Sequence, residues 1–307
     1  MRKKERLRLF CVLLIFIFVL CFLVDLLRGE RAGWLLRFLQ STHVELKRVP
    51  EPFSVAHLIL LAGTSLLTGI VLKYSSRLSV GWMTRRTDKL VFAFGLIFAS
   101  MELYKQLYCF YVLGSGSYDF SLFPFQFCSL PIYFCLLFPL LPRGTVKDAG
   151  YRFLALFGTA GGGLVILYPR LSNLLYLCLH TVIWHILMIL LGVYLLIAKD
   201  CGRSFKRDVL PSVCVFLSVV SLATVLNVIF SDIEGFQMFY MSPYHHTTFL
   251  VLDWVQARVG WWLAMLLYIL AFIFLAAIPL WWLGKFFLNR KEQGIRRVKN
   301  KKTEKNF

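Results

Sequence analysis

The sequence predicts an all-α, polytopic integral membrane protein with about eight transmembrane helices in one bundle. Three observations support this fold class. The chain has 307 residues, of which 59% are hydrophobic and 16% are charged, whereas about a quarter of the residues of a soluble domain are charged. Apolar runs long enough to cross a bilayer recur along the chain, and basic residues flank them. A backbone in lipid must satisfy its own hydrogen bonds, so we expect these runs to be helices.

The predicted spans follow from the apolar runs, because a transmembrane helix needs about 20 such residues. The first run is too long for a signal peptide and lacks a small-residue cleavage site, so we interpret it as a retained span. We expect one transmembrane domain over residues 1–307, ending in a basic tail over 285–307. The predicted spans are 9–28, 54–73, 89–113, 120–141, 150–168, 173–198, 209–230 and 259–284.

The last predicted span supports these lengths independently. Trp261 and Trp262 begin it, and Trp281 and Trp282 end it. Twenty residues of helix rise roughly 30 Å, which is the thickness of the hydrocarbon layer. Tryptophan pairs at both ends match the aromatic belts that lie at the two membrane surfaces.

The basic residues predict the orientation and the location. The net charge of +18 lies mostly in short segments beside apolar runs, which indicates membrane topology and contact with lipid headgroups and excludes nucleic acid as the partner. The loops 74–88, 142–149 and 199–208 are basic, whereas the 231–258 loop has Arg258 as its only lysine or arginine. We therefore expect a multi-pass protein of the cell (inner or plasma) membrane with both termini cytoplasmic. The basic 29–53 segment is the exception, and its WLLRFLQ patch predicts a short interfacial helix.

Two other segments favour structural roles. The GTAGGG sequence (158–163) lies inside a predicted span, where small residues allow close helix packing or a backbone break that widens a cavity. The aromatic 231–258 loop suits a lid over the outer mouth of the bundle, with Tyr244 and His245 as candidate substrate contacts. Its adjacent histidines, His245 and His246, make a poor chelate. We expect no metal or other cofactor, and the eight cysteines show no CxxC pair.

The candidate site lies in the fourth and sixth predicted spans. His180 and His185 are the ionisable side chains of the 173–198 run, and a titratable ring in hydrocarbon suggests a functional site. Cys128 lies in the 120–141 run at a similar predicted depth, beside Gln126 and Ser129. Five helical residues turn about 140°, so the two histidines cannot both face one partner squarely.

A cysteine and a histidine together predict nucleophilic chemistry. The thiol needs a base to become a nucleophile, and an imidazole can take its proton. We interpret the other apolar-run cysteines as packing residues. Glu102 and Lys105 share one helical face, where they either neutralise each other or leave Glu102 to orient a histidine. His57 and Asn227 are more typical of interhelical hydrogen bonds, although Asn227 is also a candidate substrate contact.

The motifs FPFQFCSLPIY, HTVIWHILMILLGVYL and GFQMFYMSPYHHTTFLVLDW resemble the YwaF-like integral membrane proteins, over roughly residues 85–285. That family is similar to a eukaryotic transmembrane Cys–His acyltransferase group that acts on ether phospholipids. Pro124, Cys128 and Glu102 match the family pattern, whereas Gln126 stands where histidine is usual. His185 matches the sixth-span histidine, followed by isoleucine instead of glycine.

The resemblance implies a lipid acyltransferase or acyl hydrolase acting in the bilayer. Cys128 would be the nucleophile, His185 the base, His180 a second polar contact and Glu102 an orienting residue. The residues alone leave two alternatives open. One is a transporter or small-ligand binding protein that uses the same polar cluster, and the other is a structural membrane protein. The sequence does not determine the lipid or the oligomeric state.

Overall fold

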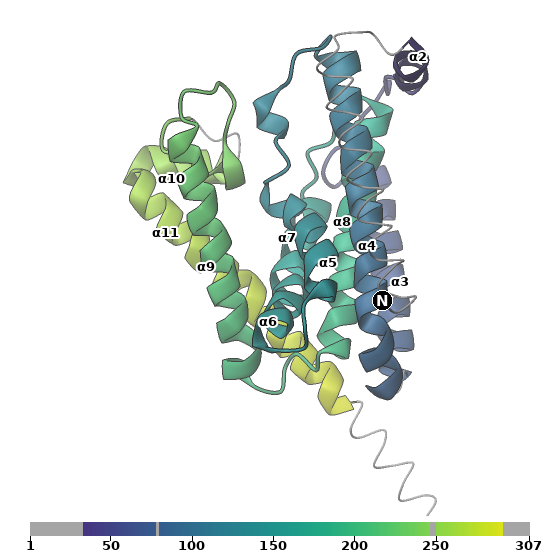
Figure 1. Ribbon diagram of the computed structural model, residues 1–307, viewed down its shortest axis with the longest axis vertical. Helices are drawn as coiled ribbons and strands as arrows, with labels where there is room; N and C mark the ends of the chain where they lie inside the picture. The colour runs from purple at the N-terminus through teal and green to yellow at the C-terminus, as the bar shows by residue number, and fades with distance from the viewer. Residues whose placement is uncertain (1–32, 78–79, 246–249, 291–307) are drawn as a thin grey trace, which may run out of the picture.

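A computed structural model describes residues 33–77, 80–245 and 250–290, and they form an all-α bundle (Figure 1). Six helical segments in this part of the chain are long and apolar enough to cross a membrane. The protein is therefore a multi-pass membrane protein. The first predicted span, 9–28, lies outside the described residues. The six segments are Val55–Ser75, Arg86–Leu113, Thr145–Leu167, Leu175–Ala198, Phe205–Ile229 and Trp261–Arg290.

Three long helices form one side of the bundle. Helix α3 (Val55–Arg77) and helix α4 (Val80–Tyr108) both pack against α8 (Leu175–Ala198), as Figure 1 shows. Helix α4 continues as a π-helical turn over Cys109–Leu113. Many leucines and isoleucines of α3 are exposed, which fits a helix that faces lipid.

The short α2 (Gly33–Ser41) confirms the helix predicted at WLLRFLQ. It lies beside the upper end of α4 in Figure 1. Its Leu39 is buried with Leu107, Tyr108 and Cys109, while Phe38 is exposed. One apolar face therefore anchors this helix to the bundle.

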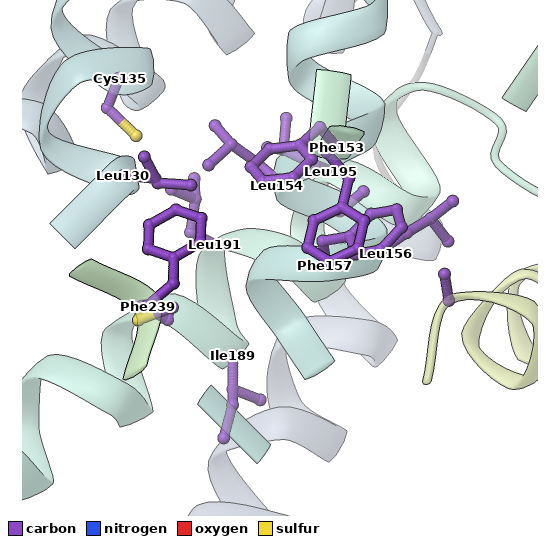
Figure 2. Packing of buried hydrophobic residues seen from close by; sticks show 14 of the residues in the cluster. Leu130, Cys135, Phe153, Leu154, Leu156, Phe157, Ile189, Leu191, Leu195 and Phe239 are labelled. Carbon is purple, nitrogen blue, oxygen red and sulfur yellow. The ribbon is translucent and has the colours of Figure 1, made fainter. Parts of the chain in front are cut away.

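The centre of the bundle holds the most buried helical segment. Helix α6 (Thr145–Phe153), a π-helical turn (Leu154–Gly158) and α7 (Thr159–Leu167) follow one another without a break, and 78% of the apolar window of this segment is buried. The short α5 (Leu130–Leu137) lies beside it and packs on α4. Figure 2 shows Phe153, Phe157 and Phe239 among the leucines of this core.

The predicted close packing of the GTAGGG segment is confirmed at two glycines. A Cβ added at Gly162 would lie 2.8 Å from the carbonyl oxygen of His185, and one at Gly161 would lie 2.6 Å from the ring of Phe127. Any larger residue would push α7 away from α8 or from Phe127. The glycines thus bring the candidate histidine helix and the Cys128 segment close to α7.

The other side of the bundle is formed by α9 (Phe205–Ile229), α10 (Leu250–Val259) and α11 (Trp261–Ala271) (Figure 1). After a π-helical turn over Phe272–Ala277, the last helical segment continues to Arg290. The four tryptophans predicted to mark its belts all lie in this one segment.

The 120–141 run differs from the continuous helix that the sequence predicts. It consists of 3-10 turns over Phe120–Leu122, Phe127–Ser129 and Phe138–Leu140 around the short α5. Three prolines explain the breaks, because proline lacks an N–H donor and forces the residue before it out of helical geometry. Figure 1 shows the chain leaving the upper end of α4 and descending into the bundle before α5 begins. The prolines are Pro124, Pro131 and Pro139.

Candidate functional site

The irregular segment before Cys128 is held by side chains from other helices. Backbone carbonyls at membrane depth need hydrogen-bond partners that the segment itself does not supply. The Gln106 amide donates to the Leu122 carbonyl at 2.7 Å, and the Tyr133 hydroxyl donates to the Pro124 carbonyl. These bonds allow the chain to enter the bundle without helical structure, and they fix where α5 begins.

Cys128 lies in the first turn of the helical segment that contains α5. Its carbonyl accepts a hydrogen bond from the Trp184 indole N–H at 2.9 Å. Cys128 is therefore level with Trp184, roughly 13 Å along α8 from Leu175. The prediction that Cys128 and the α8 histidines share a depth rested on a continuous span. The side-chain contact, and not residue counting, establishes that the level is the same.

His180 lies on the same face of α8 as Trp184. The two rings stack with centroids 5.1 Å apart and planes 26° apart, as expected for residues four apart on a helix. His180 Nε2 is buried and has no hydrogen-bond partner among the described residues. Trp184 thus separates this imidazole from the backbone of Cys128 by one indole ring.

His185 is buried and held in one orientation. Its Nδ1 lies 2.6 Å from the Thr181 carbonyl oxygen, and a carbonyl can only accept, so Nδ1 carries the proton. The neutral ring then has its lone pair on Nε2. That nitrogen is buried and has no partner in the described part of the chain. The geometry therefore presents His185 as a proton acceptor.

Gln126 and Asn227 hold the backbone of residues 237–239. Gln126 donates to the Gln237 carbonyl at 2.8 Å and accepts from the Phe239 N–H at 2.9 Å. Asn227 donates to the Met238 carbonyl at 2.9 Å and accepts from the Met238 N–H at 2.6 Å. The sequence predicted both side chains as substrate contacts, but here both atoms of each amide bond protein backbone.

The segment held in this way is strained. Phe239 and Tyr240 have φ values of 58° and 56°, a region that costs non-glycine residues about 1–3 kcal/mol each. Phe239 is fully buried and packs against Phe125 and Phe127, with centroids 5.9 and 5.8 Å apart. The turn is thereby fixed against the two residues that flank Gln126.

Tyr240 follows Phe239 in this turn and lies near Cys128. Its hydroxyl and the Cys128 thiol are within electrostatic range of each other, and burial raises the pKa of Tyr240. A phenol with a raised pKa remains a hydrogen-bond donor at neutral pH. Sequence reasoning did not identify this residue or Trp184, because their roles depend on backbone geometry and on a contact between distant segments.

Glu102 and Lys105 form the ion pair that their spacing allows. Lys105 Nζ lies 2.8 Å from Glu102 Oε1, and the same oxygen accepts from the Gln106 amide at 2.7 Å. Both charged side chains act electrostatically on the Cys128 thiol. Among the described residues the hydrogen bonds of Glu102 go to Lys105 and Gln106, which favours mutual neutralisation over the orientation of a histidine.

The remaining predicted residues differ in burial and in their hydrogen-bond partners. Ser129 is buried, and its side chain interacts with the Cys128 thiol. Tyr244 is 59% exposed, while the His245 carbonyl accepts from Gln237 at 3.1 Å. His57 donates to the Ile166 carbonyl and accepts from the Phe53 N–H, at 2.9 and 2.8 Å. It therefore joins α3 to α7, as predicted for an interhelical hydrogen-bond partner.

The sequence model of the TMEM164 family matches residues 52–283, which is most of the chain. The protein belongs to the TMEM164 family. The match includes every helix from α3 to α11 and all residues of the cluster around Cys128, so the TMEM164 family resemblance and the geometry concern the same region. No curated protein and no solved structure gives a significant match to the chain.

Family membership and the fold together establish a polytopic membrane protein of the TMEM164 family. They do not specify a reaction, which has to be inferred from the arrangement of the side chains. In this family member, the backbone of Cys128 at the start of a broken helical segment is bonded to Trp184, which lies between His180 and His185 in the sequence. The Nε2 atoms of both histidines have no partner among the described residues. In the described part of the chain no three histidine, cysteine, aspartate or glutamate residues are grouped as metal ligands.

Proposed function

We propose that the protein transfers acyl groups to or from membrane lipid through Cys128 and His185. The observation that carries this proposal is the orientation of His185. Its Nδ1–H is bonded to the Thr181 carbonyl, so a buried Nε2 lone pair remains without a partner at the level of Cys128. An unpaired buried acceptor is costly, and a general base for a thiol explains why one would be retained.

The reaction follows from these roles. His185 Nε2 takes the proton of Cys128, and the thiolate attacks the ester carbonyl carbon of a lipid. A carbon–sulfur bond forms, the ester carbon–oxygen bond breaks, and the leaving alcohol receives the proton from His185. A lipid hydroxyl then gives its proton to His185 Nε2 and attacks the thioester carbonyl carbon. A carbon–oxygen bond forms, the carbon–sulfur bond breaks, and the Cys128 thiolate takes the proton back from His185. If water attacks instead of a lipid hydroxyl, the result is hydrolysis.

The position of Cys128 supports its role as the nucleophile. It lies at the first turn of a helical segment, where backbone N–H groups favour a negative charge. The Lys105 ammonium adds a positive charge within electrostatic range. We assign His180 as a second polar contact, and Tyr240 as a hydrogen-bond donor toward the carbonyl oxygen that becomes negative in the transition state.

The test is to trap the acyl-enzyme. Purified full-length protein is incubated with a phospholipid labelled in its acyl chains, and the hydroxylamine-sensitive label on the protein is measured. Wild type should become labelled, and Cys128→Ser should abolish the label. The matched control is Cys135→Ser, a buried cysteine on α5 that packs beside Gly95 and should retain it.

The histidine variants separate the two imidazoles. His185→Asn should reduce labelling roughly as far as Cys128→Ser, because a neutral thiol is a poor nucleophile, whereas His180→Asn should cost less. Labelling that survives Cys128→Ser in a folded protein would refute the proposal. Lipid-independent uptake driven by a proton gradient would instead support a transporter that uses the same polar cluster.

We also propose that both termini lie in the cytoplasm, which places Cys128 toward the outer leaflet. The loops 142–149 and 199–208, at the lower end of the bundle, are basic, whereas the upper loops 114–119, 169–172 and 231–258 contain only Arg170 and Arg258 as lysine or arginine. This difference supports the orientation, and the basic 29–53 segment remains its exception. Reporter fusions after Arg207 and near Glu234 should report opposite sides of the membrane. A report of the same side for both positions would refute it.

A further inference from the structure

We infer that Lys105 is a specificity-determining residue that binds the phosphate of a phospholipid while its ester faces Cys128. This inference rests on the proposed function. Three observations carry it: the hydrogen bonds that Lys105 leaves unused, the residues on which its charge acts, and the way in which Glu102 is held.

Lys105 uses one of its donors. An ammonium group has three N–H donors, and among the described residues Lys105 bonds only Glu102 Oε1, at 2.8 Å. Its side chain is 17% exposed, so the protein does not enclose it completely. A charged group with open donors at this depth has an incomplete set of partners.

The charge of Lys105 is directed toward the proposed site. It acts electrostatically on the Cys128 thiol and on His180, whose Nε2 has no partner in the described part of the chain. Gln106, the next residue, donates to the Leu122 carbonyl at 2.7 Å and so joins this turn of α4 to the segment that leads into Cys128. The Lys105 ammonium itself lies 2.8 Å from the carboxylate of Glu102, which is buried and shares that oxygen with Gln106, so the ammonium lies on the bundle side of α4.

Glu102 holds the Lys105 ammonium but accepts from only one of its three N–H donors. The same carboxylate oxygen accepts from both Lys105 and Gln106, so part of its charge is already engaged. A lysine is a common point-charge ligand for phosphate. In a glycerophospholipid the phosphate and the ester are joined only through glycerol carbons, so a cation near the thiol can hold one while the thiol attacks the other.

Substitutions of Lys105 and of Glu102 should change phospholipid affinity in opposite directions. Phosphate competes with Glu102 for Lys105, so removal of the lysine charge should weaken phospholipid binding, and removal of the carboxylate should strengthen it. A purely structural ion pair would respond with the same sign to both changes, since either leaves one buried charge uncompensated.

The experiment measures binding of a fluorescent phospholipid, and of a diacylglycerol with the same acyl chains, to the full-length protein in the Cys128→Ser background. Lys105→Gln should weaken phospholipid binding roughly 10- to 100-fold, the range for one charge-assisted hydrogen bond, and leave diacylglycerol unchanged. Lys105→Arg should restore most of the affinity, and Glu102→Gln should increase it. The matched control is Lys199→Gln, whose ammonium bonds Asp148 at 2.9 Å near the lower end of the bundle.

Each outcome decides the inference. Equal losses for phospholipid and diacylglycerol, or losses of the same sign for Lys105→Gln and Glu102→Gln, would overturn it. If Lys105→Gln fails to fold, the Glu102→Gln plus Lys105→Met double variant has neither charge and should bind diacylglycerol but not phospholipid. Because this assay needs no acyl transfer, a Lys105-dependent affinity without any acyl-enzyme would uphold the inference and refute the proposed function.

Discussion

Two of the polar clusters inside this bundle differ in how completely their hydrogen bonds are made. At the lower end, Asp208 is fully buried and accepts from five donors. At the upper end, His180 and His185 each keep a buried Nε2 without a partner among the described residues. The donors to Asp208 are the side chains of Arg152, Arg207 and Trp281 and the backbone N–H groups of Gly202 and Ser204.

This difference indicates that the Asp208 cluster stabilises the fold and that the histidine cluster serves a function. A carboxylate whose lone pairs are all used can bind nothing else, so the Asp208 cluster joins α6, α9, the last helical segment and the 199–204 loop. Unused lone pairs are costly in a low-dielectric interior. They are retained where something that the protein alone does not supply, such as a substrate, completes them. Substitutions in the two clusters should therefore affect stability and activity in opposite proportions.

The largest effect on stability is expected at Asp208. Asp208→Asn leaves Arg152 buried without a countercharge and should lower the free energy of unfolding by about 3–5 kcal/mol. Thermal unfolding in detergent measures this change. The control is Asp148→Asn, which breaks a half-exposed pair with Lys199 and should cost at most about 1 kcal/mol. Similar losses for the two variants would show that the buried cluster is not the stronger restraint.

The next effect is expected at Gln126, whose amide makes hydrogen bonds through both of its polar atoms but lies at the candidate site. Gln126→Ala leaves a Phe239 N–H and a Gln237 carbonyl without partners, at a cost of about 1–3 kcal/mol. It also releases the strained turn that carries Tyr240, so acyl-enzyme formation should fall further than the folded fraction does. Gln40→Ala, at an exposed position on α2, is the control and should change neither.

A similar effect is expected for the Glu102–Lys105 pair. Glu102→Gln leaves a poorly solvated ammonium and should destabilise the protein by about 1–3 kcal/mol, whereas the additional Lys105→Met change relieves that charge. Yield and thermal unfolding of the single and double variants test this order. Equal stability across the series would show that the pair does not couple the two side chains.

The smallest effect on stability is expected at His185. Its Nε2 makes no hydrogen bond to a described residue, and the Thr181 carbonyl that accepts from Nδ1 already belongs to helix α8. His185→Gln should therefore change the free energy of unfolding by less than about 1 kcal/mol. Acyl-enzyme formation should nevertheless be lost. His57→Gln is the matched comparison, because both of its nitrogens are bonded and it should cost about 1–3 kcal/mol. A larger loss for His185 than for His57 would remove the distinction between the clusters.

The sequence by itself determined the fold class and most of the long helices. Apolar length, basic flanks and the tryptophan pairs are local properties, and lipid leaves the backbone no alternative to helix over such runs. The close packing at Gly161 and Gly162, the Glu102–Lys105 pair and the structural role of His57 were predictable for the same reason. Each follows from residue type and helical spacing.

Only the tertiary structure decided how the 120–141 run is built. Its apolar length predicts a span, but its prolines break the helix, and the break is stable because Gln106, Tyr133 and Trp184 bond the carbonyls that it leaves open. Likewise, the amides of Gln126 and Asn227 hold a strained turn. These contacts join residues that are distant in the chain, so composition and spacing carry no record of them, and they place the backbone of Cys128 beside α8.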